Sequence, residues 1–205
     1  MAGEDTFDLA ALSHAERQEA YQRCFSTTTQ PLGELDIQLD DATYPEFAEE
    51  VFDAYLTHTE FTVGVWVNYD CAAKRFYDDR RTLDCGKLIL TPNEHRQLRQ
   101  LEPEKYEISR VCLNIGTAFR LLCEVHLQAV QGKLNTGCVV NGKLRAHTRE
   151  HGHLINYVND VLDEIIDEPL EHGFNGFQLQ DLEEIAARFL RFATEDDQQL
   201  TVHSP

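Results

Sequence analysis

The sequence predicts an α+β protein that has strands near its middle and a mainly helical C-terminal half. Every odd position of residues 61–69 is apolar, which is typical of a strand with one buried face. Residues 148–167 and 179–193 instead carry apolar side chains at helical spacing. With 205 residues and 42% apolar content, the chain can bury one sizeable core or two small ones.

The N-terminal segment is polar and acidic, and we expect a partly disordered arm in which a helix covers about residues 9–23. Residues 44–58 then carry an apolar stripe at helical spacing, which must pack against another element. The expected organisation is an acidic arm at 1–43, a helix-plus-sheet core at 44–104, a helical region at 105–194 and an acidic tail at 195–205.

Two further strands and a helix are expected within the core. Residues 74–83 and 87–90 contain runs that favour strands. The helix that follows has clear start signals: Thr91 as its cap, Pro92 as its first residue and Glu94 completing a capping box.

The helical region should begin with a helix from residue 106 to about 131, because apolar residues recur there at helical spacing and Gly132 is a suitable stop. A short hairpin is expected near 139–146, since Asn141-Gly142 tolerates the positive φ of a type I′ turn. Pro169 should end the long helix 148–167.

Charge is distributed unevenly along the chain. The net charge is −18, yet residues 71–150 contain 14 Lys and Arg against 9 Asp and Glu, a net of +5. A polyanion would bind this basic centre rather than the acidic average. The acidic ends could compete with nucleic acid for the centre, attract a basic protein partner or serve solubility alone.

Aromatic side chains are interleaved with the basic ones. Alternation along the first strand places Trp66, the only tryptophan, on the face opposite the odd-numbered residues. The two faces of the second strand would carry Lys74, Phe76 and Arg80, and Arg75, Tyr77 and Arg81. Single-stranded nucleic acid suits such a surface, because bases stack on rings and cations contact phosphates. Aromatic residues also commonly fill sheets, and Asp78 and Asp79 could pair with the neighbouring arginines.

Short motifs occur in a specific order between residues 61 and 98. They are Phe61-Thr-Val63-Gly64, Lys74 with Arg80 six residues later, and Gly86-Lys87-Leu-Ile89-Leu90-Thr-Pro92 followed by Gln97-Leu98. This order resembles the core of the positive cofactor four family of transcriptional coactivators. The resemblance implies a small curved antiparallel sheet backed by a packed helix, a dimer formed through that helix, and unpaired DNA held by basic and aromatic side chains. By position, Lys74, Arg80 and Lys87 would contact phosphates.

We therefore expect a dimeric protein that binds single-stranded DNA or RNA in transcription or genome maintenance. The candidate contacts are Trp66, Lys74, Arg75, Phe76, Arg80, Arg81, Lys87 and Arg96. An alternative from another class is a nucleoprotein or capsid-type subunit that packages nucleic acid in a helical or ring assembly.

Other classes are less compatible with the sequence. It contains no GxSxG motif and no phosphate-binding glycine loop, and His147, His151 and His153 lack a completing ligand pattern, so we expect no enzyme activity, metal or cofactor. No apolar run approaches the ~18–20 residues that cross a membrane. An acidic N-terminus and six cysteines without a CxxC pair favour an intracellular protein, nuclear or cytoplasmic and not secreted, for which a viral origin would also be suitable.

Overall fold

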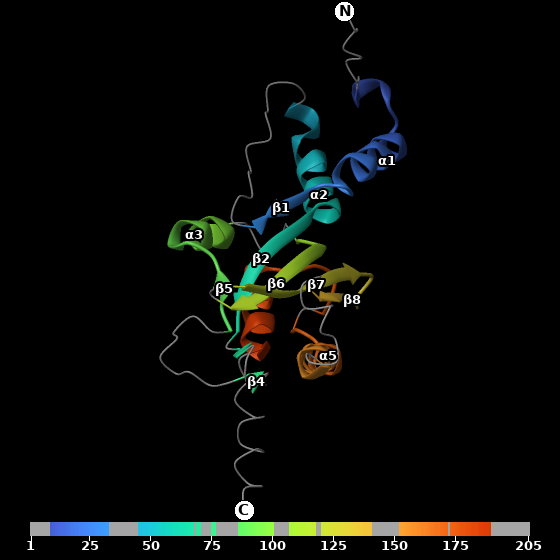
Figure 1. Ribbon diagram of the computed structural model, residues 1–205. Helices are drawn as coiled ribbons and strands as arrows, with labels where there is room; N and C mark the ends of the chain where they lie inside the picture. Colours follow the sequence, from blue (N-terminus) through green and yellow to red (C-terminus); the bar gives the residue numbers. More distant parts are fainter. Residues whose placement is uncertain are drawn as a thin grey trace, which may run out of the picture.

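The computed structural model of the protein describes residues 9–32, 45–67, 69–70, 75–76, 86–100, 107–117, 120–140, 152–171 and 173–189. A mixed sheet lies at the centre, with helices packed on and beside it (Figure 1). Its strands are β1 (Thr29–Pro31), β2 (Glu60–Trp66), β5 (Leu88–Ile89), β6 (Arg110–Thr117), β7 (Arg120–Val130) and β8 (Lys133–Val140). The α-helices are α1 (His14–Phe25), α2 (Ala48–His58), α3 (Pro92–Gln100), α5 (Gly152–Asp167) and the C-terminal helix at 179–189, and two 3-10 turns, η1 (Leu9–Ala11) and η3 (Pro45–Phe47), precede α1 and α2.

This arrangement confirms the predicted α+β class, but the sheet is mixed and not wholly antiparallel. The strand order is β1-β2-β6-β7-β8, with β5 on the same edge of β2 as β1. Strand β2 is parallel to both β1 and β6, whereas β5, β7 and β8 pair antiparallel with their neighbours. Helix α2 returns the chain between β1 and β2, and this crossover connection is what parallel neighbours require.

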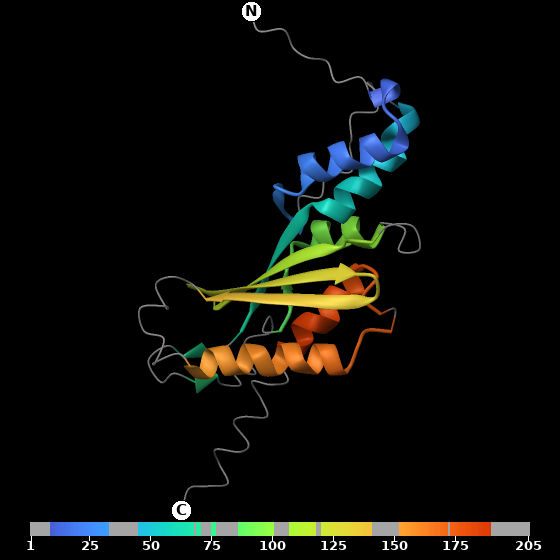
Figure 2. The same ribbon diagram turned by 90° about the vertical axis from the view of Figure 1, so that its right-hand side faces the viewer.

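The predicted alternation of β2 is confirmed. Phe61, Val63 and Val65 are at most 4% exposed, and the even positions, including Trp66, are half-buried. Helix α5 runs beneath the sheet and the C-terminal helix lies on the same side (Figure 2). Their apolar residues, such as Val158 and Phe189, join the β2 side chains in one core.

The helix predicted from residue 106 to about 131 is wrong, because this segment forms β6 and β7. Strand β6 lies between β2 and β7, and both its faces are largely buried. Apolar residues therefore occur at both odd and even positions of this central strand, and their spacing resembles that of an amphipathic helix.

The predicted role of Gly132 as a helix stop is also wrong. Gln131 and Gly132 have φ of 50° and 74° and connect β7 to β8, as a tight hairpin turn requires. Val139 and Val140 form the end of β8, and the turn of the hairpin expected near 139–146 stays a prediction. Residues 141–146 lie outside the described residues.

The N-terminal arm predicted at 1–43 is partly wrong, since residues 9–32 belong to the folded domain. The expected helix is confirmed as α1, which begins with a capping box between Ser13 and Glu16. Strand β1 then pairs with β2, and Leu32 is 1% exposed in the core. Residues 1–8 and 33–43 lie outside the described residues.

The strands predicted at 74–83 and 87–90 are present where the structure describes these residues. Residues 75–76 form β4 (Arg75–Phe76), which pairs with β3 (Tyr69–Asp70), and β5 confirms the strand expected at 87–90. The capping box of α3 is confirmed, because the Glu94 N–H donates to Thr91 Oγ1 and the Thr91 N–H donates to the Glu94 carboxylate. The remainder of residues 74–83 lies outside the described residues.

Helix α1 is joined to α2 by a bidentate ion pair. Arg17 Nε and Nη2 donate to the Glu50 carboxylate at 3.0 and 2.9 Å, and the guanidinium lies 4.4 Å from the centroid of the Phe47 ring. These hydrogen bonds lower the pKa of Glu50. The pair therefore stabilises the fold above the unfolded-state pKa of glutamate, and this contribution is lost as the pH falls through the lower folded-state pKa.

We predict that Glu50→Gln lowers the thermal midpoint at neutral pH, and that its difference from the wild type shrinks as the solution is acidified. Circular dichroism melts across pH would measure both effects. Glu19→Gln is the matched control, because its pair with Arg23 joins side chains that are 63% and 76% exposed and should contribute little. A Glu50→Gln deficit that is the same at every pH would contradict the prediction.

Candidate nucleic-acid interface

The structure places the predicted contact residues in three groups. Trp66, Lys87 and Arg96 have described side chains, Arg75 and Phe76 are described in β4 by their backbone alone, and Lys74, Arg80 and Arg81 lie outside the described residues. Trp66 is half-buried, and the other two described side chains are exposed.

Trp66 and Lys87 line one hollow of about 540 Å³. The backbone explains their proximity: the Gly86 N–H donates to the Trp66 carbonyl at 2.8 Å, and β5 then pairs antiparallel with β2. Gly86 has φ of 69°, a conformation that glycine adopts without strain. The remaining lining residues are Gly86, Leu88, Ile89, Leu90, His95, Glu183 and Ala187.

Helix α3 contributes His95 to this hollow, but it does not bring Arg96 there. Arg96 is exposed on the same helix and is absent from the lining. The predicted contacts thus separate into Trp66 and Lys87, which the fold brings together, and Arg96, which it leaves apart.

The one carboxylate in the lining is already paired. Glu183 Oε1 lies 3.3 Å from His95 Nδ1 and 3.3 Å from Arg99 Nη2, so it joins the C-terminal helix to α3. Within the described part of the chain, no ion pair involves Lys87. Among the described side chains, no carboxylate therefore competes with an anion for the ammonium group of Lys87.

The ribbon of β3 and β4 continues the chain directly after β2. Phe76 pairs with Tyr69 and Arg75 pairs with Asp70 in its backbone register. A predicted ring and a predicted cation thus belong to a short ribbon that follows Trp66 in sequence.

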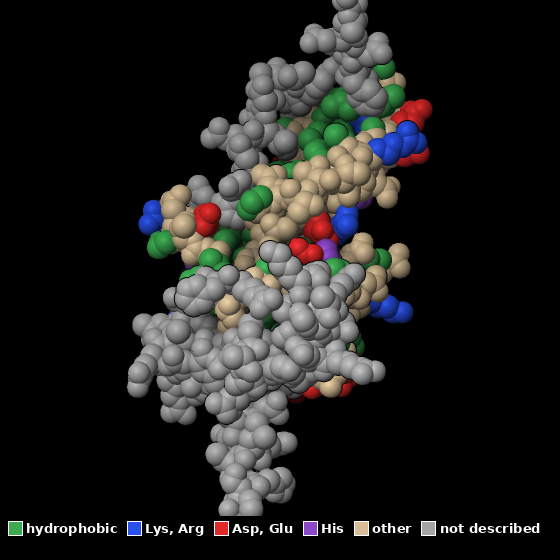
Figure 3. All heavy atoms as spheres, viewed as in Figure 1, with side chains coloured by type: hydrophobic (Ala, Val, Ile, Leu, Met, Phe, Trp, Pro, Cys, Tyr) green, Lys and Arg blue, Asp and Glu red, His purple; other side chains and the backbone are tan. Residues whose placement is uncertain are grey.

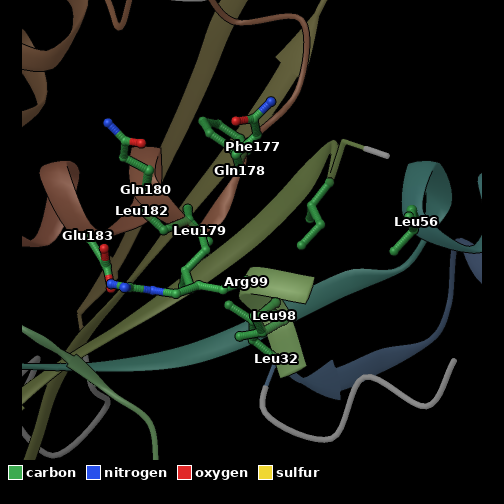
Figure 4. Close-up of a pocket in the computed structure, with 11 residues that line it drawn as sticks. Leu32, Leu56, Leu98, Arg99, Phe177, Gln178, Leu179, Gln180, Leu182 and Glu183 are labelled. Atoms are coloured by element: carbon green, nitrogen blue, oxygen red, sulfur yellow. The ribbon is translucent and has the colours of Figure 1, made fainter. Parts of the chain in front are cut away.

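Figure 4 shows the residues that line a second cavity, of about 490 Å³. Its walls include Leu32, Leu56 and Phe177, each about 1% exposed, and its edge carries Arg99 extended toward Glu183. Glu183 lines both spaces. The lining combines apolar side chains with the polar Arg99, Gln178, Gln180 and Glu183.

The face of the sheet that carries His126 is polar, and it holds carboxylates as well as basic side chains. His126 Nδ1 lies 2.9 Å from Glu60 Oε1, and Cys112 is the Cα partner of His126. Burial, with Glu60 and Glu124 nearby, raises the pKa of Cys112 to about 12. This thiol therefore stays protonated at neutral pH and is not an activated nucleophile.

Basic side chains are dispersed on the face shown in Figure 3, where the described Lys and Arg atoms lie apart from one another. The predicted basic surface depends instead on residues 74–81, most of which lie outside the described residues. The sequence did not reveal His95 or Glu183 as neighbours of Trp66, because the C-terminal helix reaches this site only through tertiary packing.

Metal and membrane features were searched within the described residues. No group of three or more His, Cys, Asp or Glu side chains among them could hold a metal ion. No described helix combines the length and apolar character that crossing a bilayer demands.

No protein-family model, curated protein or solved structure matches this chain. The fold is an α+β domain. Its candidate site is a hollow at one edge of the sheet, lined by the aromatic ring of Trp66 and the cation of Lys87.

Proposed function

We propose that this protein binds single-stranded nucleic acid at the end of β2. Trp66 provides the ring on which a base stacks, and Lys87 contacts a phosphate. The observation that carries this proposal is that both side chains line one hollow, where no described ion pair involves Lys87. Stacking and phosphate neutralisation together recognise single strands with little sequence preference.

The dimensions and position of the hollow support this role. A volume of about 540 Å³ falls within the range of pockets that hold small organic groups, so one base fits. Arg75 and Phe76 lie on the ribbon that follows β2, so a strand leaving the hollow in that direction would meet a further cation and ring. The remainder of the chain is acidic and would repel a nucleic acid, so the contact is restricted to this region.

Intrinsic fluorescence tests the proposal directly, because Trp66 is the only tryptophan. We predict that a thymidine oligonucleotide quenches its emission, that a duplex of the same length does so less, and that the quenching weakens with salt. By anisotropy with a labelled oligonucleotide, Trp66→Ala should bind about 5- to 100-fold more weakly, the loss expected for one stacked base. Trp66→Phe should retain part of the affinity.

Lys87→Gln should also weaken binding and reduce the slope of log affinity against log salt by about 0.7, the value for one phosphate contact with a single strand. Lys133→Gln is the matched control, since Lys133 is also exposed but begins β8. A folded Trp66→Ala protein that binds as tightly as the wild type would overturn the proposal. So would a wild type whose emission the oligonucleotide leaves unchanged.

The alternative function is an assembly subunit that packages nucleic acid. The observation that favours it is the outer edge of β8, which no described strand covers. An open assembly requires contacts between copies that repeat without closing. Rods or rings that lengthen with the nucleic acid would support the alternative, and a particle of constant size would favour the first function.

A further inference from the structure

Strand β8 is an edge strand of the sheet: among the described strands it pairs with β7 alone. The strand order is β1-β2-β6-β7-β8, and β8 pairs with β7 over all eight of its residues. Among the described residues, no strand pairs with its other side, which also lies at the margin of the fold in Figure 1. Half of the backbone N–H and C=O groups of such a strand point outward and can accept a further strand.

The edge carries only one of the features that usually prevent pairing, the lysine at its first position. Natural edge strands are protected by proline, by charged side chains and especially lysine, by inward-pointing charges or by bulges. Strand β8 reads Lys133-Leu-Asn-Thr-Gly-Cys-Val-Val140, without proline or acidic residues, and its one charge is at its first position. The register between β7 and β8 is uninterrupted from Val130 to Cys123. In a chain of net charge −18, this regular segment without acidic residues is unusual.

The apolar side chains of β8 are only partly covered. Leu134 and Cys138 pack against the core but are half-buried. Thr136 lies midway between them, so apolar residues stand two positions away on each side of it. The core face of β8 therefore has one apolar residue two positions before Thr136 and another two positions after it. An antiparallel copy of the strand centred on Thr136 would place these apolar residues opposite each other.

We propose that β8 pairs antiparallel with β8 of a second copy, with the twofold axis at Thr136. Leu134 then lies opposite Cys138 of the partner subunit, and each covers the half-exposed side chain of the other. Lys133 lies opposite Val139 of the partner subunit, so no like charges oppose each other across the strands. The contact is isologous and closes after two copies, which yields a dimer with one continuous sheet.

Helix α3, through which the family resemblance implies dimerisation, is less suited to this role. Its Leu98 is 6% exposed within the chain, and His95 and Arg99 are paired with Glu183 of the same chain. Pro92, at the start of α3, is the one described side chain of this helix that is both apolar and exposed. The helix is thus directed toward its own C-terminal helix, and the β8 edge remains for a second copy.

Sedimentation velocity of the full chain tests the proposal without nucleic acid, so its outcome is independent of the proposed function. We expect a dimer that tightens with salt, because salt screens the repulsion between two strongly acidic chains. Nucleic-acid binding should show the opposite salt dependence. The variant Asn135→Lys with Gly137→Lys should be a monomer, since it places ammonium groups opposite one another. A Cβ at Gly137 meets no atom closer than 4.0 Å, so the fold accepts this change.

The matched control is Gln128→Lys with Val130→Lys, which adds the same charge to exposed positions of β7, one strand inside the edge. It should remain a dimer. If the double β8 variant does not fold by circular dichroism, Thr136→Lys serves instead, since the axis places two copies of this residue face to face. A monomeric wild type would overturn the proposal, and so would a folded edge variant that still forms the wild-type dimer, which would place the contact elsewhere.

Discussion

Replacing Phe61 with alanine should lower the free energy of unfolding by about 3–5 kcal/mol, the cost typical of removing a fully buried phenyl ring. Phe61 is 0% exposed, and its ring meets Tyr55 edge to face with centroids 5.4 Å apart. Tyr55 in turn contacts Phe25 of α1 at 5.5 Å. The ring of Phe61 thus connects the sheet to α2 and, through Tyr55, to α1. The cavity left by alanine would weaken the packing of both helices on the sheet.

Urea unfolding followed by circular dichroism measures this loss. Thr62→Ala is the matched control, because Thr62 is the next residue of the same strand but lies half-buried on the opposite face. It should cost less than about 1 kcal/mol, as is common away from a core. Equal losses for the two variants would contradict the assignment of the two faces of β2.

The faces of β2 could be predicted because one side of this strand meets the core and the other does not. Alternation from Phe61 to Val65 therefore appears directly in the sequence. The start of α3 was equally evident, since the Thr91–Glu94 capping box is a local interaction. Such signals need no knowledge of what packs against the element.

The pairing of strands could not be predicted in the same way. Parallel contacts of β2 with β1 and β6 join segments that are distant in sequence, and no local pattern encodes them. Strand β6 was mistaken for a helix because Cys112 and Leu113 are both buried on opposite faces, which conceals the period of two. A glycine with positive φ fits both a hairpin turn and a helix end, and the sequence around Gly132 does not distinguish these two structures.

The sequence predicts only the part of the candidate site that lies on the predicted strands. Trp66 and Lys87 come together because β5 pairs with β2, and the local motifs indicated both strands. Glu183 and Ala187 complete the hollow from a helix near the end of the chain. Their participation depends on how that helix packs, which hydrophobic spacing does not specify.

At concentrations where the chain is monomeric, Cys138 should be alkylated by iodoacetamide at neutral pH faster than Cys112. A hydrogen bond with the thiol of Cys123 lowers the pKa of Cys138 to about 7, and the nearby His126 acts in the same direction. The same hydrogen bond and deep burial raise the pKa of Cys123. At neutral pH a larger share of Cys138 than of Cys112 is therefore thiolate, because burial raises the pKa of Cys112 to about 12.

Peptide mapping by mass spectrometry at a series of pH values would follow each cysteine separately. Cys123→Ala removes the hydrogen-bond donor, so the alkylation profile of Cys138 should move to higher pH, whereas Cys123→Ser retains a donor and should keep the wild-type profile. Comparing the two variants separates the hydrogen bond from simple packing, because alanine and serine are both smaller than cysteine. If alanine and serine at position 123 gave the same profile, the low pKa of Cys138 would have another cause, such as the field of His126.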